Sequence, residues 1–398
     1  MHAVRRRTVR ATQLAAVLLA CSTSIISPFA RQLAVPRPVP PPQVVWWVTG
    51  EGHGRPVVDR DTVYFLSSRH EVVAVAPDTG AVRWRHATGE PGDTTAGSAL
   101  TVAGSTVIAG DYNLVGFDRT TGAVRWRFTA PLGYGPGIYL GEVSGTTVLA
   151  GSPAGRLYAV YATTGELRWS AEIVRQLPTT VFQPATDGTV VAAGYTTFTA
   201  PPVGGVVLLD FATGRELWRA RFPTAPDPLL GTGYGSGLLL TRSAIVASSG
   251  DGSVYGFSRA DGSQLWVLPP LAVPPPFSSP FPVPPGPGAD YRPLARSGGL
   301  LIVGSLKGRV TAFDAITRRE RWTHAVAGGG SVAFALTADD EAVYVPLASG
   351  RHLALDASTG RERWRTADPR DDFLWPAFLA GNHVYLAGGR GGFIAVRR

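Results

Sequence analysis

The chain has 398 residues, of which 44% are hydrophobic and 10% aromatic, with 48 glycines and 33 prolines. This mixture favours many short strands joined by tight turns over disorder or a helical bundle. Of the 37 basic residues, six arginines lie in residues 1–43, which hold no acidic residue, so the rest has 31 basic against 29 acidic residues. No basic stripe with interleaved aromatics remains in the body, and we predict no nucleic-acid binding.

The first 30 residues have the layout of a secretory leader. Four arginines fall within the first ten residues, an apolar run covers residues 11–20, and Cys21, the single cysteine of the chain, follows directly. A cationic start before an apolar run is typical of a signal peptide. We therefore expect residues 1–30 to be a signal peptide, a lipoprotein leader or a membrane anchor outside the folded body.

Three forms of this leader stay open. Leu-Leu-Ala-Cys at residues 18–21 is similar to a bacterial lipobox, which makes Cys21 a candidate lipidation site. The uncharged residues 11–30 are just long enough to span a bilayer uncleaved. Ordinary secretion, with Arg6 and Arg7 marking a twin-arginine route, is the third form. All three place the body outside the cytoplasm, and the first two also anchor it to a membrane.

Residues 31–43 are rich in proline and separate the leader from the body. Such a segment is a semi-rigid spacer of ~3 Å per residue. It would hold the body clear of a membrane surface, or else it is a join without a role. The lone cysteine also excludes a disulfide framework, so the body must be stabilised by packing.

A block of a turn followed by tryptophan repeats along the body. Seven times a tryptophan follows a turn position, usually Thr-Gly, by four residues, and successive tryptophans are 42, 43, 49, 48, 56 and 42 residues apart. This is the period of a propeller blade. The seven residues are Trp84, Trp126, Trp169, Trp218, Trp266, Trp322 and Trp364.

Each block predicts one four-stranded antiparallel unit. Alternating runs such as residues 62–66 and 72–75 predict two strands, the Thr-Gly turn closes a hairpin because glycine accepts positive φ, and the tryptophan strand ends the unit. The C-terminal runs 375–379, 383–386 and 393–397 lack a tryptophan strand. Residues 43–48 can supply it, with Trp47 (or Trp46) in the repeated place 37 residues before Trp84. The sequence thus predicts an eighth unit closed by the N-terminal strand.

The block Asp-x-x-Thr-Gly-x-x-x-Trp resembles the repeat of the PQQ-type β-propeller family, which includes PQQ-binding-like and BamB-like proteins. The resemblance covers about residues 44–398 and implies an all-β, eight-bladed propeller in which each tryptophan docks one blade on the next. Four aspartates match the first motif position, namely Asp118, Asp210, Asp314 and Asp356. Arg318 replaces the turn glycine of one unit, so we expect that hairpin to have a different shape.

No residues of this chain are predicted to form a catalytic, cofactor-binding or metal site. The seven histidines are scattered without metal-ligand spacing. Quinoprotein dehydrogenases, which are similar in repeat, carry an adjacent cysteine pair beside the quinone, and one cysteine at position 21 cannot supply it. Their catalytic Asp and calcium ligands also have no match here. We therefore predict that the chain is not an enzyme and needs no cofactor.

The loops that join each tryptophan strand to the next unit are the candidate binding face. Residues 267–292 form the longest of them, and loops of this length are uncommon without a role. Aromatic and arginine side chains on loops are typical interface anchors. The candidates are Tyr134, Tyr234, Tyr291, Arg292, Asp371 and Trp375. A variable surface insertion is the alternative interpretation of the long loop.

The function that this sequence favours is a non-catalytic, extracytoplasmic binding scaffold. We expect a monomeric propeller, anchored to a membrane through its N-terminus, that engages a protein or cell-envelope polymer through one face. A PQQ- or sugar-dependent oxidoreductase-like protein is the alternative function, and a secreted protein is the alternative location.

Overall fold

The computed structural model describes residues 41–48, 52–67, 69–89, 99–110, 112–130, 137–175, 178–198, 203–223, 234–269, 293–305, 307–326, 332, 335–366, 375–388 and 392–398. All of them lie in the larger of two units into which the chain divides, Val39–Arg398, the other being Met1–Pro38. Within the described ranges every regular element is a β-strand. The prediction of an all-β chain is confirmed.

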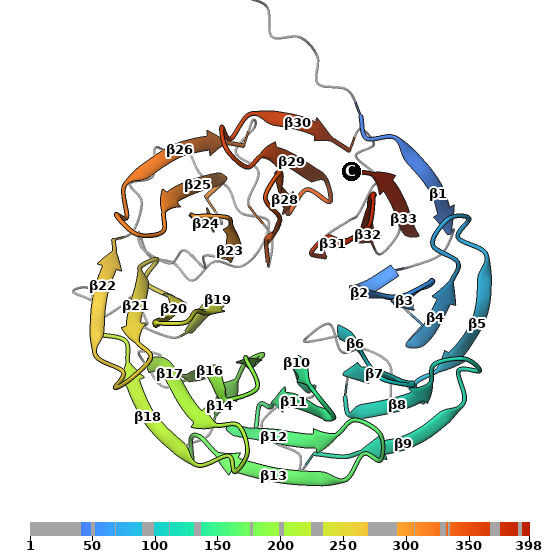
Figure 1. Ribbon diagram of the computed structural model, residues 1–398, viewed down its shortest axis with the longest axis horizontal. Coiled ribbons are helices and arrows are strands. Elements are labelled where there is room, and N and C mark those ends of the chain that lie inside the picture. Colours follow the sequence, from blue (N-terminus) through green and yellow to red (C-terminus); the bar gives the residue numbers. More distant parts are fainter. Residues whose placement is uncertain are drawn as a thin grey trace, which may run out of the picture. The chain divides into compact units, whose positions relative to one another are not determined.

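The strands form eight groups, most of which contain four antiparallel strands that follow one another in the chain (Figure 1). Group 1 contains β2 (Gly52–Asp59), β3 (Thr62–Ser67), β4 (Glu71–Val75) and β5 (Val82–Ala87). Group 2 contains β6 (Ala99–Ala103), β7 (Thr106–Gly110), β8 (Leu114–Asp118) and β9 (Val124–Phe128). One parallel bridge, Arg55 to Ala99, joins these two groups into an eight-stranded sheet.

The middle of the chain supplies three further groups. Group 3 contains β10 (Tyr139–Ser144), β11 (Thr147–Gly151), β12 (Arg156–Tyr161) and β13 (Leu167–Glu172). Group 4 contains β14 (Thr179–Val181), β15 (Ala185–Thr186), β16 (Val190–Thr197), β17 (Val203–Asp210) and β18 (Glu216–Arg221). Group 5 contains β19 (Tyr234–Leu240), β20 (Ala244–Ser249), β21 (Val254–Ser258) and β22 (Gln264–Leu268). In group 4 both β14 and β15 pair with β16, so its first strand is split in two.

The C-terminal part of the chain supplies the last three groups. Group 6 contains β23 (Leu294–Ser297), β24 (Leu300–Ser305), β25 (Arg309–Asp314) and β26 (Glu320–Ala325). Group 7 contains β27 (Thr337–Ala338), β28 (Ala342–Pro346), β29 (His352–Asp356) and β30 (Glu362–Arg365). Group 8 contains β31 (Phe378–Ala380), β32 (His383–Gly388), β33 (Gly392–Arg397) and, from the other end of the chain, β1 (Val44–Val48).

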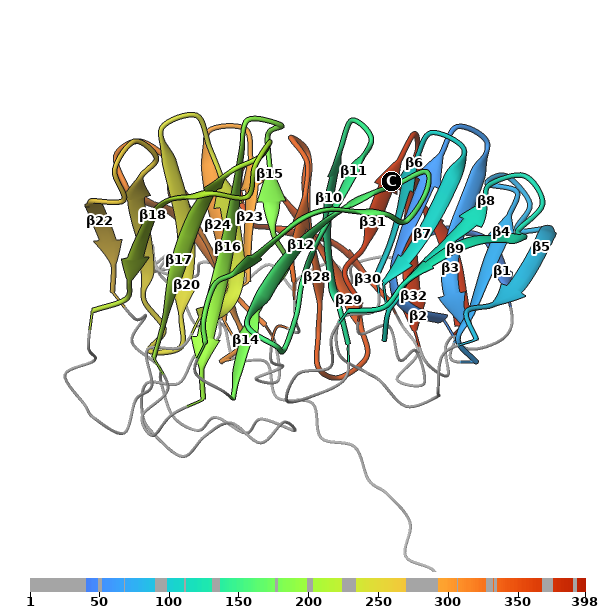
Figure 2. The ribbon, with the colours of Figure 1, turned by 90° about the horizontal axis from the view of Figure 1, so that it is seen from below.

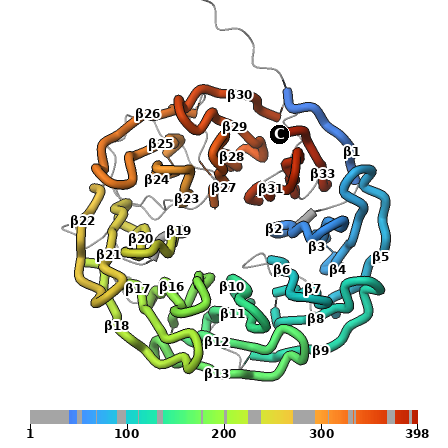
Figure 3. The backbone as a smooth tube through the Cα atoms, viewed as in Figure 1, coloured from blue at the N-terminus to red at the C-terminus, as the bar shows by residue number. Residues whose placement is uncertain are grey.

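The N-terminal strand pairs with the C-terminal one. β1 runs antiparallel to β33, with Trp47 opposite Ile394 and Val48 opposite Phe393. Figure 3 shows this contact where the blue end of the tube meets the red end. In Figure 1 the groups follow one another in chain order, with their first strands innermost and their tryptophan strands outermost. The predicted pairing of residues 43–48 with the C-terminal strands is therefore present.

Two sides of this arrangement differ (Figure 2). The hairpins between first and second strands and between third and fourth strands lie on one side, which we call the turn face. The strand ends that lead from second to third strands, and from each tryptophan strand toward the next group, lie on the opposite side, which we call the loop face. Antiparallel order fixes this division because successive strands reverse direction.

Each neighbouring pair of groups shares a hydrophobic cluster. In β3, Val63 and Phe65 pack with residues of group 8, whereas Tyr64 and Leu66 pack with residues of group 2. Side chains alternate across a strand, so a middle strand with neighbours on both sides must be apolar at nearly every position. This is why the β3 sequence TVYFLS is buried almost throughout. The core therefore consists of the junctions between groups.

The tryptophan of β1 is one residue from its expected place. Trp46 is 8% exposed and Trp47 is 55% exposed, so the prediction for Trp47 is wrong. The register with β33 slips between Val44 and Trp46, as it slips just before the tryptophan in the other tryptophan strands. This bulge turns the side chain two residues after Val44 toward group 1. Trp46 therefore occupies the repeated position, and Trp47 points outward.

Candidate binding surfaces

The repeated tryptophans join each group to the next one. The Trp126 indole N–H donates a hydrogen bond of 3.1 Å to the Ala162 carbonyl of group 3. Its ring lies over the turn glycine Gly165, where φ is +76° and a Cβ would come within 2.6 Å of the ring. A side chain at this turn would therefore be strained by the backbone conformation and would also meet the ring. Equivalent indole bonds are donated by Trp46, Trp84, Trp169, Trp218 and Trp322.

Aspartates at the first motif position close the third hairpin of their groups. The Asp118 carboxylate accepts hydrogen bonds from the backbone N–H groups of Thr121 (2.8 Å) and Thr120 (2.9 Å). The bond from Thr121, aided by Arg125 and opposed by partial burial, lowers the pKa of Asp118 to about 2. Asp210, Asp314 and Asp356 accept the same kind of bonds. These matched aspartates order turns on the turn face.

Arg318 departs from the motif without changing the hairpin. Its φ is +62°, and its backbone N–H donates 2.9 Å to the Asp314 carbonyl, as that of Gly214 donates 2.9 Å to Asp210. The expectation of a different hairpin shape is therefore wrong. What changes is the tryptophan contact, because the Arg318 guanidinium lies 4.1 Å from the Trp266 ring centroid. The Trp266 indole N–H has no hydrogen-bond partner among the described residues.

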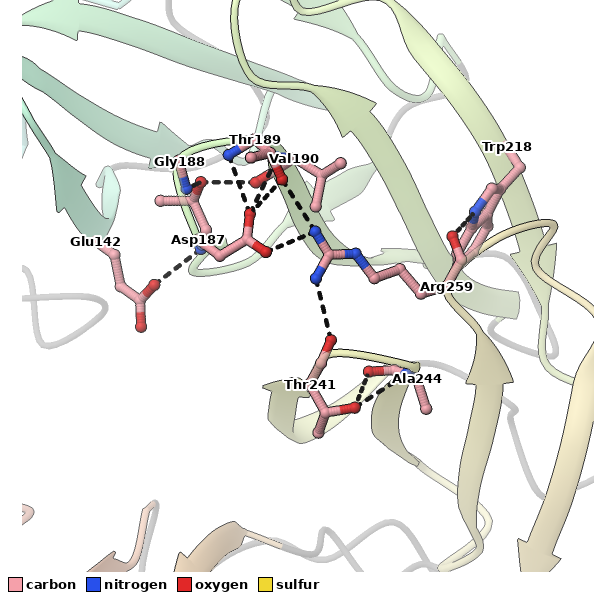
Figure 4. Close-up of polar contacts among 10 residues, drawn as sticks. Glu142, Asp187, Gly188, Thr189, Val190, Trp218, Thr241, Ala244 and Arg259 are labelled. Atoms are coloured by element: carbon pink, nitrogen blue, oxygen red, sulfur yellow. Dashed lines mark hydrogen bonds and ion pairs between the residues drawn. The ribbon is translucent and has the colours of Figure 1, made fainter.

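An arginine on the turn face links group 5 to group 4 (Figure 4). Arg259 pairs with Asp187 at 2.5 Å and donates hydrogen bonds to the Thr189 hydroxyl (3.0 Å) and to the Thr241 carbonyl of its own group (3.2 Å). Its own carbonyl accepts the indole N–H of Trp218 at 2.9 Å. One residue thus binds the neighbouring group through both its backbone and its side chain.

The partner carboxylate of Arg259 is held in place as well. Burial opposes the charge of Asp187, but bonds from the Thr189 hydroxyl and N–H, followed by Arg259, lower its pKa. The Thr186 N–H donates 2.8 Å to Glu142 of group 3, which continues the network to the next junction (Figure 4). Such a network keeps Asp187 ionised at neutral pH.

The same pairing recurs at two other junctions, and we call the three pairs the arginine clamps. Arg119 of group 2 pairs with Asp59 of group 1 at 2.6 Å and donates to its own group at Gly104. Arg398 of group 8 pairs with Asp339 of group 7 at 2.5 Å and donates to Gly381. Sequence reasoning missed the clamps, although Arg119 and Arg259 share one motif position.

A shallow hollow lies at the turn face beside one clamp. Its volume is about 590 Å³, and it is lined by Glu341, Asn382, His383, Arg397 and Arg398. His383 and Arg397 face each other across β32 and β33. The size is within the range of small-molecule sites, but this lining is polar where such sites are mostly apolar.

Besides Asp59, which belongs to an arginine clamp, the innermost strands carry three charged side chains. Arg55 of β2 lies over the Phe378 ring of β31 at 5.6 Å, and Glu142 extends from β10. Arg296 of β23 donates to the Gly298 carbonyl. Sequence reasoning did not single them out, because a lone charge in a short strand has no local pattern.

Most of the predicted binding-face residues lie outside the described residues. This holds for Tyr134, Tyr291, Arg292 and Asp371, and also for the lipidation candidate Cys21. Tyr234 begins β19, and only its backbone is described. Trp375 is partly buried and packs beside Phe378 against the cluster shared by groups 8 and 1. Its ring therefore has a packing role in addition to any exposed surface.

The described part of the chain contains no group of three or more His, Cys, Asp or Glu side chains positioned to hold a metal ion. Within the same ranges, no helix has the length and apolar character needed to cross a membrane.

Known proteins share this repeat and this fold. The assembly factor BamB of Bordetella pertussis is 27% identical over 211 residues, which is 52% of this chain and 46% of that relative, so the chain matches less than half of its length. The crystal structure of BamB from Moraxella catarrhalis has a TM-score of 0.61 at 18% identity and covers 87% of this chain and 94% of its own.

Quinohemoprotein alcohol dehydrogenase from Comamonas testosteroni is also similar in fold. Its TM-score is 0.66 at 15% identity, over 89% of this chain and 75% of that one. At such low identities both structures show the fold alone, which unrelated functions share. A family model described as outer membrane protein assembly factor BamB matches residues 39–181, 175–282 and 284–398. The chain therefore belongs to this PQQ-type, BamB family of repeat proteins.

Proposed function

We propose that the chain is a non-catalytic, extracytoplasmic binding scaffold that serves the assembly of outer-membrane proteins. The match of the BamB family model across residues 39–398 carries this proposal. The relative from Bordetella pertussis is named an outer membrane protein assembly factor, and a function in assembly comes to this chain from that name. The partner we propose is a protein of the same assembly process.

The body that presents the binding surface is, in this proposal, a closed eight-bladed propeller over residues 44–398. Each of the eight groups would be one blade, and β1 would close the ring beside β33. Two observations support closure: the β1–β33 pairing and the cluster in which Trp46, Phe65 and Phe393 bring groups 8 and 1 together. In a closed ring, each blade packs against a neighbour on both of its faces. Such a ring gives a rigid platform for binding.

The body would be held at a membrane by the N-terminal segment. Residues 1–30 would act as a lipoprotein leader with Cys21 as the lipidated residue, or as an uncleaved anchor, and residues 31–43 would form the spacer. The cationic start and the apolar run support this part of the proposal. Assembly of outer-membrane proteins takes place outside the cytoplasm, which agrees with such a leader.

The loop face would bind the partner. Tyr134, Tyr234, Tyr291, Arg292 and Asp371 remain the candidate anchors, since tyrosine and arginine dominate interface energetics. Trp375 is a poor choice for a binding variant because its partly buried ring packs against the core. An alanine there would lower stability as well as binding.

Cross-linking in the source cell, followed by affinity capture and mass spectrometry, tests the proposal. The test variant replaces Tyr291, Arg292 and Asp371 by alanine. The matched control replaces three exposed residues of the turn face, Arg215, Ile316 and Arg361, by alanine. We expect an envelope assembly protein to be captured by the wild type and the control and lost from the test variant. Capture that is equal in all three would contradict the loop-face assignment.

A further inference from the structure

The outermost strands carry a charged pattern on their exposed side. The residues just before and just after the docking tryptophan are exposed in most of these strands, whereas its ring is buried or half-buried. The residue before it is arginine in five groups, namely Arg83, Arg125, Arg168, Arg321 and Arg363. Charges on edge strands discourage pairing with other chains. An outermost strand with apolar residues at both positions lacks this protection, which suggests that its edge contacts another surface.

Two outermost strands replace both flanking charges by apolar residues. In β22 they are Leu265 and Val267, and in β1 they are Val45 and Trp47. Trp47 is 55% exposed, and it is the one exposed tryptophan of the ten in the chain, all of which are described. Val44 adds a further exposed side chain to β1. β1 thus presents the apolar edge with an exposed indole.

The strands beside β1 are cationic. In Figure 1, β1 lies between β30 of group 7 and β5 of group 1. β5 exposes Arg83 and Arg85, and β30 exposes Arg363, although each of these arginines also has a carboxylate within 4 Å. An indole flanked by long arginine side chains suits a lipid–water interface. The ring enters the headgroup region while the guanidinium groups reach phosphate.

The position of β1 in the chain indicates that the surface it contacts is a membrane. The strand begins at Val44, directly after a segment with six arginines, no acidic residue and an uncharged run over residues 11–30. Even a fully extended chain of 13 residues, the number in 31–43, spans no more than about 45 Å. β1 is therefore the strand whose attachment lies nearest to the anchor. The apolar edge of β22 lies on the far side of the arrangement (Figure 1).

We propose that the outer edge at β1, formed by Val44, Val45 and Trp47, lies against the lipid bilayer surface and fixes the orientation of the body at the membrane. This inference rests on the proposed N-terminal anchoring. It replaces a body that is free at the end of a spacer with one that meets the membrane by a defined edge.

Fluorescence quenching by lipid tests the contact. The full chain is mixed with vesicles of phosphatidylethanolamine and phosphatidylglycerol, with or without a lipid that carries a shallow doxyl quencher. Residues 1–43 contain no tryptophan, so insertion of the leader gives no signal of its own. Trp47→Phe removes the reporter. Adding Leu265→Trp to Trp47→Phe places the reporter on the equivalent edge of β22 as a matched control.

We expect every variant to pellet with the vesicles and to keep its circular dichroism spectrum. Doxyl lipid should quench a component of the wild-type emission that is absent in Trp47→Phe and not restored by Leu265→Trp. Chain that pellets with no difference in quenching between wild type and Trp47→Phe would overturn the inference and leave anchoring intact. Chain that does not pellet would overturn both. Protection of Trp47 from acrylamide without vesicles, rising with protein concentration, would assign the edge to a second copy and overturn the lipid contact.

Discussion

Two neighbouring junctions of the molecule solve the same packing problem differently. Between groups 4 and 5, the Trp218 ring lies over Gly262, and its indole N–H bonds to the Arg259 carbonyl at 2.9 Å. Between groups 5 and 6, the turn residue is Arg318, whose guanidinium stacks on Trp266, and the indole N–H has no described partner. The difference indicates that ring contact holds a junction and that glycine serves to let the ring come close.

Loss of a docking ring should have the largest effect. Trp218→Ala removes a ring and a hydrogen bond, and we expect a loss of ~3–5 kcal/mol in the free energy of unfolding. Trp266→Ala should cost about 1 kcal/mol less, because no indole bond is lost there. Denaturant unfolding of both variants measures the difference. Equal losses of stability in the two variants would show that the indole hydrogen bond of Trp218 does not stabilise its junction.

Exchange of the turn residues should have the next largest effect. Gly262→Ala adds a Cβ at φ +74°, 2.6 Å from Trp218, so it should cost more than ~1 kcal/mol. Arg318→Gly relieves a positive φ but loses the cation–ring contact, so we expect a change of less than ~1 kcal/mol. Thermal unfolding of the two variants separates them. A loss from Arg318→Gly as large as that from Gly262→Ala would break the proposed distinction.

The arginine clamp between groups 4 and 5 should make a smaller contribution to the free energy of unfolding. Arg259→Met keeps the aliphatic part of the side chain and removes the pair with Asp187, and pairs that are partly open to water contribute ~1 kcal/mol or less. A double-mutant cycle with Asp187→Asn isolates the coupling energy. Arg242→Met, an exposed arginine in the same group, is the control. Zero coupling would leave the clamp without an energetic role.

The pH dependence of a single turn should be the smallest effect. The pKa of Asp118 is lowered from its ordinary value of 3.8 to about 2, so its ionised form is favoured in the folded chain. The stabilisation is then full above about pH 4 and is lost as pH falls toward 2. The difference in melting temperature between wild type and Asp118→Asn should shrink over that range. A difference that grows toward low pH would have the wrong sign for this mechanism.

Repetition explains why so much of the frame could be predicted. One turn and one tryptophan recurring every 42–56 residues predicted the groups and the pairing of residues 43–48 with the C-terminus. The prediction of Trp47 as the docking residue was wrong because the choice between Trp46 and Trp47 depends on a bulge. The sequence does not show this bulge, so it could not distinguish two adjacent tryptophans. The prediction of a different hairpin at Arg318 was wrong because the backbone hydrogen bonds of the turn form even with a non-glycine residue at positive φ.

The surfaces were less predictable than the frame. Asp59 and Arg119 are 60 residues apart, and nothing local in the sequence indicates that their turns meet. The hollow at Arg397 is lined by residues of groups 7 and 8, so it can be recognised only when the positions of both groups are known. The apolar edge of β1 was visible only after the flanking positions of all eight tryptophan strands could be compared. Binding sites between repeats depend on such contacts, which the repeat itself does not encode.

The most direct test of the assembly function is quantitative proteomics of the cell envelope after removal of the chromosomal copy from the source cell. We expect outer-membrane proteins to decrease and the wild-type chain to restore them. The variant with alanine at Tyr291, Arg292 and Asp371 should not restore them, although it folds and reaches the envelope. An envelope protein profile that is unchanged by the removal would contradict the assembly function.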